Sequence, residues 1–404
     1  MTVTGGAIEA TSSARLDASG GRAGGRIRIG GDRRGAGPLP RAERLSVAEG
    51  ATIAADGGAG RGGEITLWSE GVTAVAGAIS ATGAQGGAVE TSGRFALDIA
   101  ASARVEVGAG GSWLLDPRNI VIDDRGASIG GGTSTPPAGA GPWRVDAGAI
   151  IAALDGGADV TIATTAPGSD AGTIFVGANV TWSGDGDLRL VADDSLTVNY
   201  NMLSTGAGDL TLEAGTDFIL DAKILAATGT GALTIDAGHN LAIRAHPTNT
   251  RTISTEDGRL AIDVGRDVFI DRNVAAVGPH NTQIYSTSGA LDMTAGRAID
   301  LRGGALGGTW VRVGQQGSSA DVTLRAPTVS FRGGGAGNTY AELVGGAEGS
   351  ITVAASERIV FANGAGDQGR VQAPTALPSP CALRSRSGTG RCAPARALRT
   401  AAKR

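Results

Sequence analysis

The acidic residues are the first candidates for chemistry in this chain. Carboxylates gather at Asp123-Asp124, Asp185, Asp187 and Asp193-Asp194. Paired carboxylates can act as acid and base on a polysaccharide or hold Ca²⁺. However, neighbouring residues of a strand point to opposite faces, and most of these aspartates fall in expected turns. We therefore expect them to form turn hydrogen bonds, and we predict no catalytic, cofactor-binding or metal-binding residue.

Histidine, cysteine and glycine patterns indicate no common type of site either. His239, His246 and His280 lack the spacing of metal ligands, so loop positions are expected for them. The two cysteines, Cys381 and Cys392, both lie near the C-terminal end, so no disulfide framework supports the rest of the chain. The glycine-rich runs lack the Lys-Ser/Thr pair of a phosphate-binding loop.

Tryptophan side chains offer a different kind of chemistry, because an exposed indole stacks on sugar rings whereas a buried one only packs. Trp68 follows a stretch whose inward-facing residues are Ile65 and Leu67, so its side chain should lie outside that set and pack locally. The five tryptophans, each of which could be buried or exposed, are Trp68, Trp113, Trp143, Trp182 and Trp310.

A repeat in the second half supplies the elements that would position these residues. Its seven units begin at Gly186, Gly208, Gly231, Gly258, Gly289, Ala320 and Gly349, which are 22, 23, 27, 31, 31 and 29 residues apart. Each unit contains two pairs of alternating apolar residues, such as Leu210 and Leu212 followed by Phe218 and Leu220. This spacing of two is typical of strands with one buried face.

The turn between the two strands of a unit has a nearly constant length. It often contains an Ala-Gly pair, as in Ala214-Gly215, Ala237-Gly238 and Ala295-Gly296, and we predict a glycine with positive φ there. The residues after the turn form a column that should stack at one corner as a hydrogen-bonded ladder. This column contains Ser195, Asp217, Asn240 and Asp267.

Stacking of these units predicts the fold class. A lone strand pair exposes its edges and half of its apolar face, whereas stacked coils cover both. With 68 glycines and only 3% aromatic residues, the core must be built from many small aliphatic side chains. We predict an all-β, right-handed parallel β-helix with coils in 1–123 and 145–372, a Gly/Pro/Ser-rich loop in 124–144, and a short helix within Val145–Gly157.

The C-terminal segment 373–404 loses the repeat, and we expect it to be a disordered tail. Eight basic residues and no acidic residue lie between Gln368 and Arg404, so the formal charge of −4 leaves −12 on the rest of the chain. An acidic body and a basic tail without aromatic residues predict no nucleic-acid partner. No apolar run reaches the ~18 residues of a membrane span, and the start MTVTGGAIEA has no signal-peptide pattern.

Three motifs occur in a fixed order between Gly57 and Ile122. They are GG-x-I-x-L-W-S from Gly62, GG-x-V-E-x-S-G from Gly86, and L-L-D-P-x-N-I-x-I from Leu114. In these motifs the chain resembles the central region of filamentous-haemagglutinin-like exoproteins of Gram-negative bacteria. The likeness continues upstream through 24–32 and, more loosely, downstream to about residue 365.

The resemblance implies the structural stalk of a secreted or surface-exposed adhesin that mediates attachment without catalysis. It implies export by two-partner secretion, through an outer-membrane transporter that recognises an N-terminal domain not visible in this chain. We therefore expect a fragment of a longer protein whose partners are host or bacterial surface glycans or receptors. The alternatives are a β-helical polysaccharide lyase or hydrolase and a non-functional fragment of a degraded adhesin gene.

Overall fold

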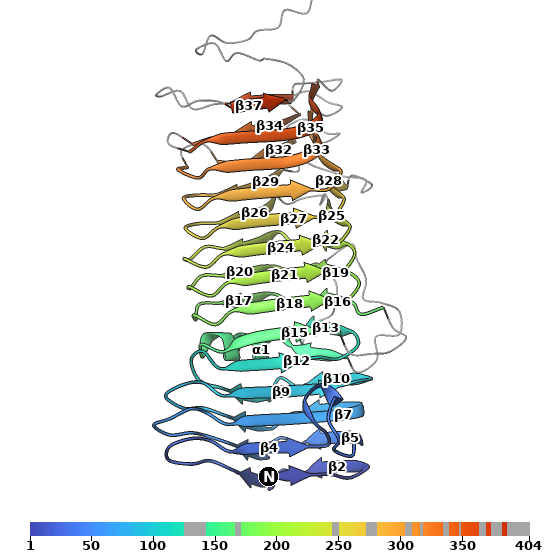
Figure 1. The fold of residues 1–404 in the computed structure, drawn as a ribbon, viewed down its shortest axis with the longest axis vertical. Helices are drawn as coiled ribbons and strands as arrows, with labels where there is room; N and C mark the ends of the chain where they lie inside the picture. The colour runs from blue at the N-terminus through green and yellow to red at the C-terminus, as the bar shows by residue number, and fades with distance from the viewer. Residues whose placement is uncertain are drawn as a thin grey trace, which may run out of the picture.

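The computed structural model describes residues 1–124, 143–165, 171–244, 250–271, 281–303, 309–315, 318–333, 339–346, 349–362, 369–372 and 382–385. Within these ranges the chain winds into a tall column of coils, with the N-terminus at one end (Figure 1). Every pairing between the described strands is parallel, and each strand pairs with its counterpart in the neighbouring coil. The prediction of an all-β parallel β-helix is therefore confirmed.

Three stacks of strands form the walls of the column. The first contains β1 (Thr2–Val3), β4 (Arg26–Ile29), β7 (Glu64–Val75), β9 (Ala88–Gly93), β12 (Ser112–Leu115), β15 (Asp159–Ala163), β18 (Leu188–Ala192), β21 (Leu210–Ala214), β24 (Leu233–Ala237), β27 (Leu260–Val264), β30 (Leu291–Ala295), β33 (Val322–Arg332), β35 (Ile351–Ala362) and β37 (Ala382–Ser385). The second contains β2 (Ala7–Ala10), β5 (Ala42–Val47), β10 (Ala96–Ile99), β14 (Arg144–Asp146), β13 (Ile120–Asp123), β16 (Ile174–Val176), β19 (Leu196–Val198), β22 (Phe218–Leu220), β25 (Asn240–Arg244), β28 (Asp267–Asp271) and β31 (Ala298–Arg302). Because β7, β33 and β35 run through both stacks, the two stacks form one 25-stranded sheet.

The third stack is divided into two parts. The N-terminal part contains β3 (Arg15–Asp17), β6 (Thr52–Ala54), β8 (Ala78–Ser80) and β11 (Arg104–Glu106). The C-terminal part contains β17 (Val180–Trp182), β20 (Met202–Ser204), β23 (Ile224–Ala227), β26 (Arg251–Thr255), β29 (Thr282–Ser286), β32 (Trp310–Val313), β34 (Tyr340–Val344) and β36 (Gly369–Gln372).

Residues at equivalent positions of the repeat stack in register, as the spacing of the units predicts. In the first stack, Leu188 pairs with Leu210, which pairs with Leu233, and the series continues to Ile351. The inward-facing side chains of these strands are almost wholly buried and form one continuous apolar core. Small aliphatic residues in register thus build the interior.

The conformation predicted for the Ala-Gly turns is wrong. None of Gly215, Gly238 and Gly296 has a positive φ. Glycine is needed there because of close approach: a Cβ on Gly238 would lie 2.1 Å from the carbonyl oxygen of Gly215, the equivalent residue in the preceding coil. The stacked backbones leave no room for a side chain at this corner.

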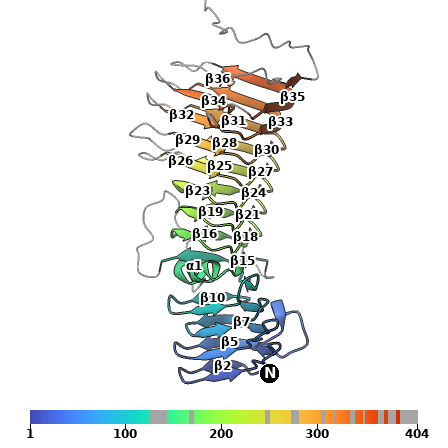
Figure 2. The same ribbon diagram turned by 90° about the vertical axis from the view of Figure 1, so that its left-hand side faces the viewer.

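The helix predicted after the loop is present as α1 (Ala147–Asp155). The Asp146 side chain accepts a hydrogen bond from the backbone N–H of Ala149, which caps the helix N-terminus, and Ile150 and Leu154 are fully buried. The helix contacts β11 and β17, and so takes the place of a strand between the two parts of the third stack. Figure 2 shows it at the level between β10 and β15.

The same region reverses the order of two strands. In the second stack β14 pairs with β10 on one side and with β13 on the other, although β13 precedes β14 in sequence. The predicted loop 124–144 lies between these two strands, and its residues 125–142 are outside the described ranges. Arg144, assigned to the loop, is the first residue of β14.

The predicted disordered tail includes one described strand. Residues Ala382–Ser385 form β37, which pairs with β35, so the prediction of disorder throughout 373–404 is wrong for these four residues. The other residues of 373–404 lie outside the described ranges.

Candidate functional site

The aspartates considered for chemistry have separate structural partners. Asp123 is 1% exposed in β13 and forms an ion pair with Arg144 of β14. Burial raises the pKa of the Asp123 carboxyl, against the effect of the guanidinium. Asp124, the next residue, is exposed. The Asp123–Arg144 ion pair therefore connects β13 and β14, the two strands whose order in the stack is reversed relative to the sequence.

Asp187 belongs to a ladder of aspartates at one corner of the column. Its carboxylate accepts a hydrogen bond from the backbone N–H of Asp209 at 2.8 Å, and its own N–H donates to Asp159 at 3.2 Å. The next step joins Asp209 to the N–H of Ala232 at 2.7 Å. Burial and the like charges of Asp159 and Asp209 raise the pKa of Asp187. Asp185, two residues before Asp187 in the sequence, is exposed.

Asp194 also joins neighbouring coils, whereas Asp193 pairs with a residue two coils earlier. Asp193 lies 3.8 Å from Arg118, and Asp194 accepts a hydrogen bond from the Thr216 hydroxyl at 2.7 Å. The structure therefore does not bring the predicted candidates together in one group. Across the described part of the chain, no three His, Cys, Asp or Glu side chains are placed to hold a metal ion.

The predicted corner ladder is present at its middle step. The Asp217 carboxylate accepts hydrogen bonds from the backbone N–H and the side-chain amide of Asn240, at 3.2 and 2.8 Å. Asn240 pairs in register with Asp267, whose carboxylate accepts hydrogen bonds from Arg297. Ser195 precedes β19, and only its backbone carbonyl, which accepts from Ile174, takes part in coil pairing among its described contacts.

The aromatic and histidine candidates divide by burial. Trp68, Trp113 and Trp182 are at most 4% exposed, so these three cannot stack on a sugar. Trp143 and Trp310 are partly exposed. His239 is exposed in a turn, whereas His246 and His280 lie outside the described residues.

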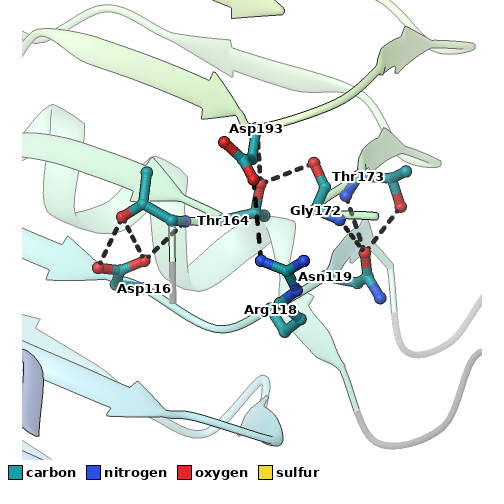
Figure 3. Close-up of polar contacts among 8 residues, drawn as sticks. Asp116, Arg118, Asn119, Thr164, Gly172, Thr173 and Asp193 are labelled. Carbon is teal, nitrogen blue, oxygen red and sulfur yellow. Dashed lines mark hydrogen bonds and ion pairs between the residues drawn. The ribbon is translucent and has the colours of Figure 1, made fainter. Parts of the chain in front are cut away.

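The polar residues of the L-L-D-P-x-N motif form a cluster that the analysis of single residue types missed (Figure 3). The Asn119 side-chain oxygen accepts three hydrogen bonds, from the N–H groups of Gly172 and Thr173 and from the Thr173 hydroxyl, at 2.8 to 3.2 Å. Asp116 accepts from the N–H and the hydroxyl of Thr165, each at 3.1 Å. The turn thus holds the ends of the next coil's segment 165–173.

A second feature that the sequence did not reveal is a strap, residues 30–41, which leaves the column after β4 and returns at β5. A hydrogen bond between the N–H of Ala42 and the carbonyl of Gly30, at 2.7 Å, closes its base. The strap contains the 3-10 turn η1 (Arg33–Gly35) and lies against the outward-facing ring of Trp68. Trp68 therefore points away from the core, as predicted, yet is covered by the strap.

The strap is anchored on two buried carboxylates from later coils. Glu90 is 2% exposed and accepts a hydrogen bond from the backbone N–H of Arg34 at 2.9 Å. Asp116 is 5% exposed and lies 3.6 Å from the Arg34 guanidinium. Burial raises the pKa of Glu90, while the Arg34 N–H and the charge of Arg33 act in the opposite direction. The strap therefore spans β7, β9 and the turn after β12.

Beside the strap lies a recess of about 350 Å³. It is lined by Arg34, Gly35, Arg41, Trp68, Arg94, Asp116 and Thr165. Its basic side chains come from the strap and from the turn before β10, and its acidic wall comes from the L-L-D-P-x-N motif. The recess is thus the place where cationic, acidic and hydroxyl groups from separate coils meet.

The comparisons with known proteins leave this geometry as the main guide to function. No protein-family model matches the chain, and no curated protein matches it. Among the described residues, no helix has both the length and the apolar character needed to cross a membrane.

Proposed function

We propose that the chain is the structural stalk of a secreted or surface-exposed bacterial adhesin, which mediates attachment without catalysis. The observation that carries this proposal is the use of its polar side chains. The aspartates at the corners, the L-L-D-P-x-N turn and the strap all join one coil to another. Such side chains extend a solenoid, and a solenoid presents its outer faces and loops over a long distance.

Export and partners follow from the motif resemblance. The proposed route is two-partner secretion, with an outer-membrane transporter that recognises an N-terminal domain, and the proposed partners are glycans or receptors on host or bacterial surfaces. The proposed location is the cell surface or the medium. The three motifs between Gly57 and Ile122 support this part of the proposal.

Attachment is tested with beads that carry the full chain. We expect them to adhere to cultured epithelial cells or to bacteria more strongly than beads that carry an unrelated protein of similar charge. A variant with Asn in place of Asp185, Asp187, Asp193 and Asp194 should adhere equally well. Absence of adhesion by the folded chain would contradict the proposal.

The enzymatic alternative predicts a different outcome in a second assay. A β-helical lyase or hydrolase would shorten acidic or neutral polysaccharides, and loss of that activity in the same four-fold Asp variant would favour it. We expect no change in polysaccharide length with either protein, because each of Asp187, Asp193 and Asp194 already interacts with a residue of another coil.

A further inference from the structure

A second recess lies between the strap and the outer face of β4, β7 and β9, and we call it the first-stack recess. Its volume is about 180 Å³, and Arg28, Thr66 and Glu90 lie in its lining. These three residues pair in register, Arg28 with Thr66 and Thr66 with Glu90, so their side chains leave three successive coils on the same face. Asp32 and Arg33 of the strap also line the recess. It therefore forms only where the strap meets the stacked coils.

One oxygen of Glu90 is buried at this recess without a hydrogen-bond donor. Oε1 accepts from the N–H of Arg34 at 2.9 Å, whereas Oε2 has no hydrogen-bond partner among the described residues. The Nε of Arg33 lies 4.0 Å from Oε2, which exceeds hydrogen-bond distance, and Ser92 lowers the pKa of the carboxyl without donating to Oε2 in hydrogen-bond geometry. Because Glu90 is 2% exposed, a carboxylate oxygen without a donor is costly here.

A buried donor of the same recess also lacks a partner. Nη1 of Arg28 donates to Asp32 at 2.7 Å, but the Nε of Arg28 is buried and has no hydrogen-bond partner among the described residues. The recess thus combines an acceptor that needs a donor with a donor that needs an acceptor. A hydroxyl group can act as both.

The charges that line the first-stack recess balance one another. Three guanidinium groups and three carboxylates line it, so the formal charge of the lining is zero. A charged ligand would therefore leave an uncompensated charge in the recess, whereas a neutral ligand would not. The three oppositely charged pairs are Arg26–Glu64 at 2.7 Å, Arg28–Asp32 at 2.7 Å and Arg33–Glu90 at 4.0 Å.

We propose that the first-stack recess binds a neutral sugar unit through its hydroxyl groups. One hydroxyl would donate to Oε2 of Glu90, and the oxygen of the same or an adjacent hydroxyl would accept from the Nε of Arg28. A cavity of about 150 Å³ holds one six-membered ring. The recess, at about 180 Å³, therefore admits one sugar ring. This inference deepens the attachment function proposed above and rests on it for its biological role, but binding is measured independently of attachment.

Calorimetric titration of the full chain with three sugars tests the proposal. The probes are methyl glucoside, which is neutral, glucosamine, which is cationic, and glucuronate, which is anionic. We expect methyl glucoside to bind, and neither charged sugar to bind more than about tenfold more tightly, because the charges of the recess are balanced. Absence of methyl glucoside binding by the folded chain would leave the two buried atoms to ordered water and overturn the proposal. A preference of more than about tenfold for either charged sugar would indicate a site for an ion and would also overturn it.

Two variants locate the binding. Glu90→Gln keeps an acceptor for the Arg34 N–H but replaces Oε2 with a donor, so it should weaken methyl glucoside binding by about tenfold or more. Arg28→Lys keeps the positive charge beside Asp32 but removes Nε, and we expect a loss of similar size. Because Glu90→Gln removes a buried charge, it should remain folded even if Arg28→Lys does not.

The matched controls are Glu213→Gln and Arg189→Lys. These two residues form an ion pair at 2.7 Å on the outer face of the same stack, in β21 and β18, away from the strap. Both controls should leave the affinity for methyl glucoside unchanged. Unchanged affinity in Glu90→Gln would overturn the first-stack recess as the site, and so would an equal loss in the controls.

The two proposals fail in distinguishable ways. Methyl glucoside binding that depends on Glu90, together with failure of the coated beads to adhere, would support the recess and contradict the attachment function. Adhesion of the beads without methyl glucoside binding would support attachment and overturn the recess as a sugar site.

Discussion

At the scale of residues, the protein places buried charge where neighbouring coils must be joined. Arg251 of β26 is 2% exposed, and its guanidinium donates to Asp221 at 2.8 Å and to the carbonyl of Arg244 at 3.1 Å. Burial lowers the pKa of Arg251 to about 10, so the side chain stays charged at neutral pH. Such a pair is costly to break because the remaining partner is left charged and buried.

Removal of one partner of this pair should destabilise the protein strongly. We expect Arg251→Ala to lower the free energy of unfolding by about 3–5 kcal/mol. The double replacement Arg251→Met with Asp221→Leu should cost less, because it removes both buried charges and the other guanidinium beside Asp221, that of Arg244 at 3.9 Å, is 27% exposed to solvent. Chemical denaturation of both variants provides the measurement, and equal losses in the two would contradict this explanation.

Glu90 provides a residue-scale prediction about pH. Its folded-state pKa is raised chiefly by burial, so the folded protein binds this proton more tightly than the unfolded chain. The associated stability is present below the unfolded pKa of ~4.3 and is lost as the pH rises through the folded pKa. Glu90→Gln keeps the acceptor for the Arg34 N–H but carries no charge.

The melting temperature of Glu90→Gln should therefore exceed that of the wild type at pH 7, and the difference should shrink toward pH 4. Thermal unfolding across this pH range checks the prediction. A variant that is less stable than the wild type at pH 7 would show that the charges of Arg33 and Arg34 outweigh the cost of burial.

At the scale of elements, turns and the strap hold successive coils together. Asn119 illustrates this, because its one side-chain oxygen receives three donors from the segment 172–173. The strap does the same over a longer distance, from η1 to β9 and to the turn after β12. These contacts fix the alignment of particular coils, whereas the strand pairing is the same from one coil to the next.

Loss of the Asn119 side chain should loosen the turn. We expect Asn119→Ala to cost about 1–3 kcal/mol, since backbone donors lose their acceptor. Asn119→Asp keeps an acceptor oxygen in the same place and should cost less. Thermal or denaturant unfolding distinguishes the two, and equal destabilisation would mean that the hydrogen bonds to 172–173 contribute little.

Gly35 tests the strap. It has φ +63°, and a Cβ there would lie 2.3 Å from Cζ2 of Trp68. Gly35→Ala should therefore destabilise the protein by more than the ~1–2 kcal/mol of the left-handed conformation alone. Gly110 is the matched control, because it has φ +67° but open space at the Cβ position. Equal losses of stability in Gly35→Ala and Gly110→Ala would show that the strap shifts at little cost to make room for the added Cβ.

The sequence allowed prediction of those elements whose signals are local. Alternation of apolar residues predicts the strands and the register from Leu188 to Ile351, and the helical spacing of Ile150 and Leu154 predicts α1. The strap contacts were not predictable, because Arg34 and Glu90 are 56 residues apart and, although Glu90 lies in the GG-x-V-E-x-S-G motif, no local pattern connects it with Arg34. The reason for the turn glycines was also missed, since it depends on the backbone of the adjacent coil.

At the scale of the whole molecule, the described coils are interrupted at α1. The first and second stacks run past this level through β12, β15, β13 and β16, whereas the third stack has the helix in place of a strand. Because the buried residues of both parts belong to one continuous core, the two parts should be stabilised together. A solenoid of this kind gains its stability from contacts between neighbouring coils.

Far-UV circular dichroism of the full chain during thermal unfolding tests this account most directly. We predict a strand-dominated spectrum and one cooperative transition, because the coils before and after α1 share a core. A coil-like spectrum would contradict the claim that the stacked coils support themselves. Two well-separated transitions would contradict the claim that α1 joins them into one structure.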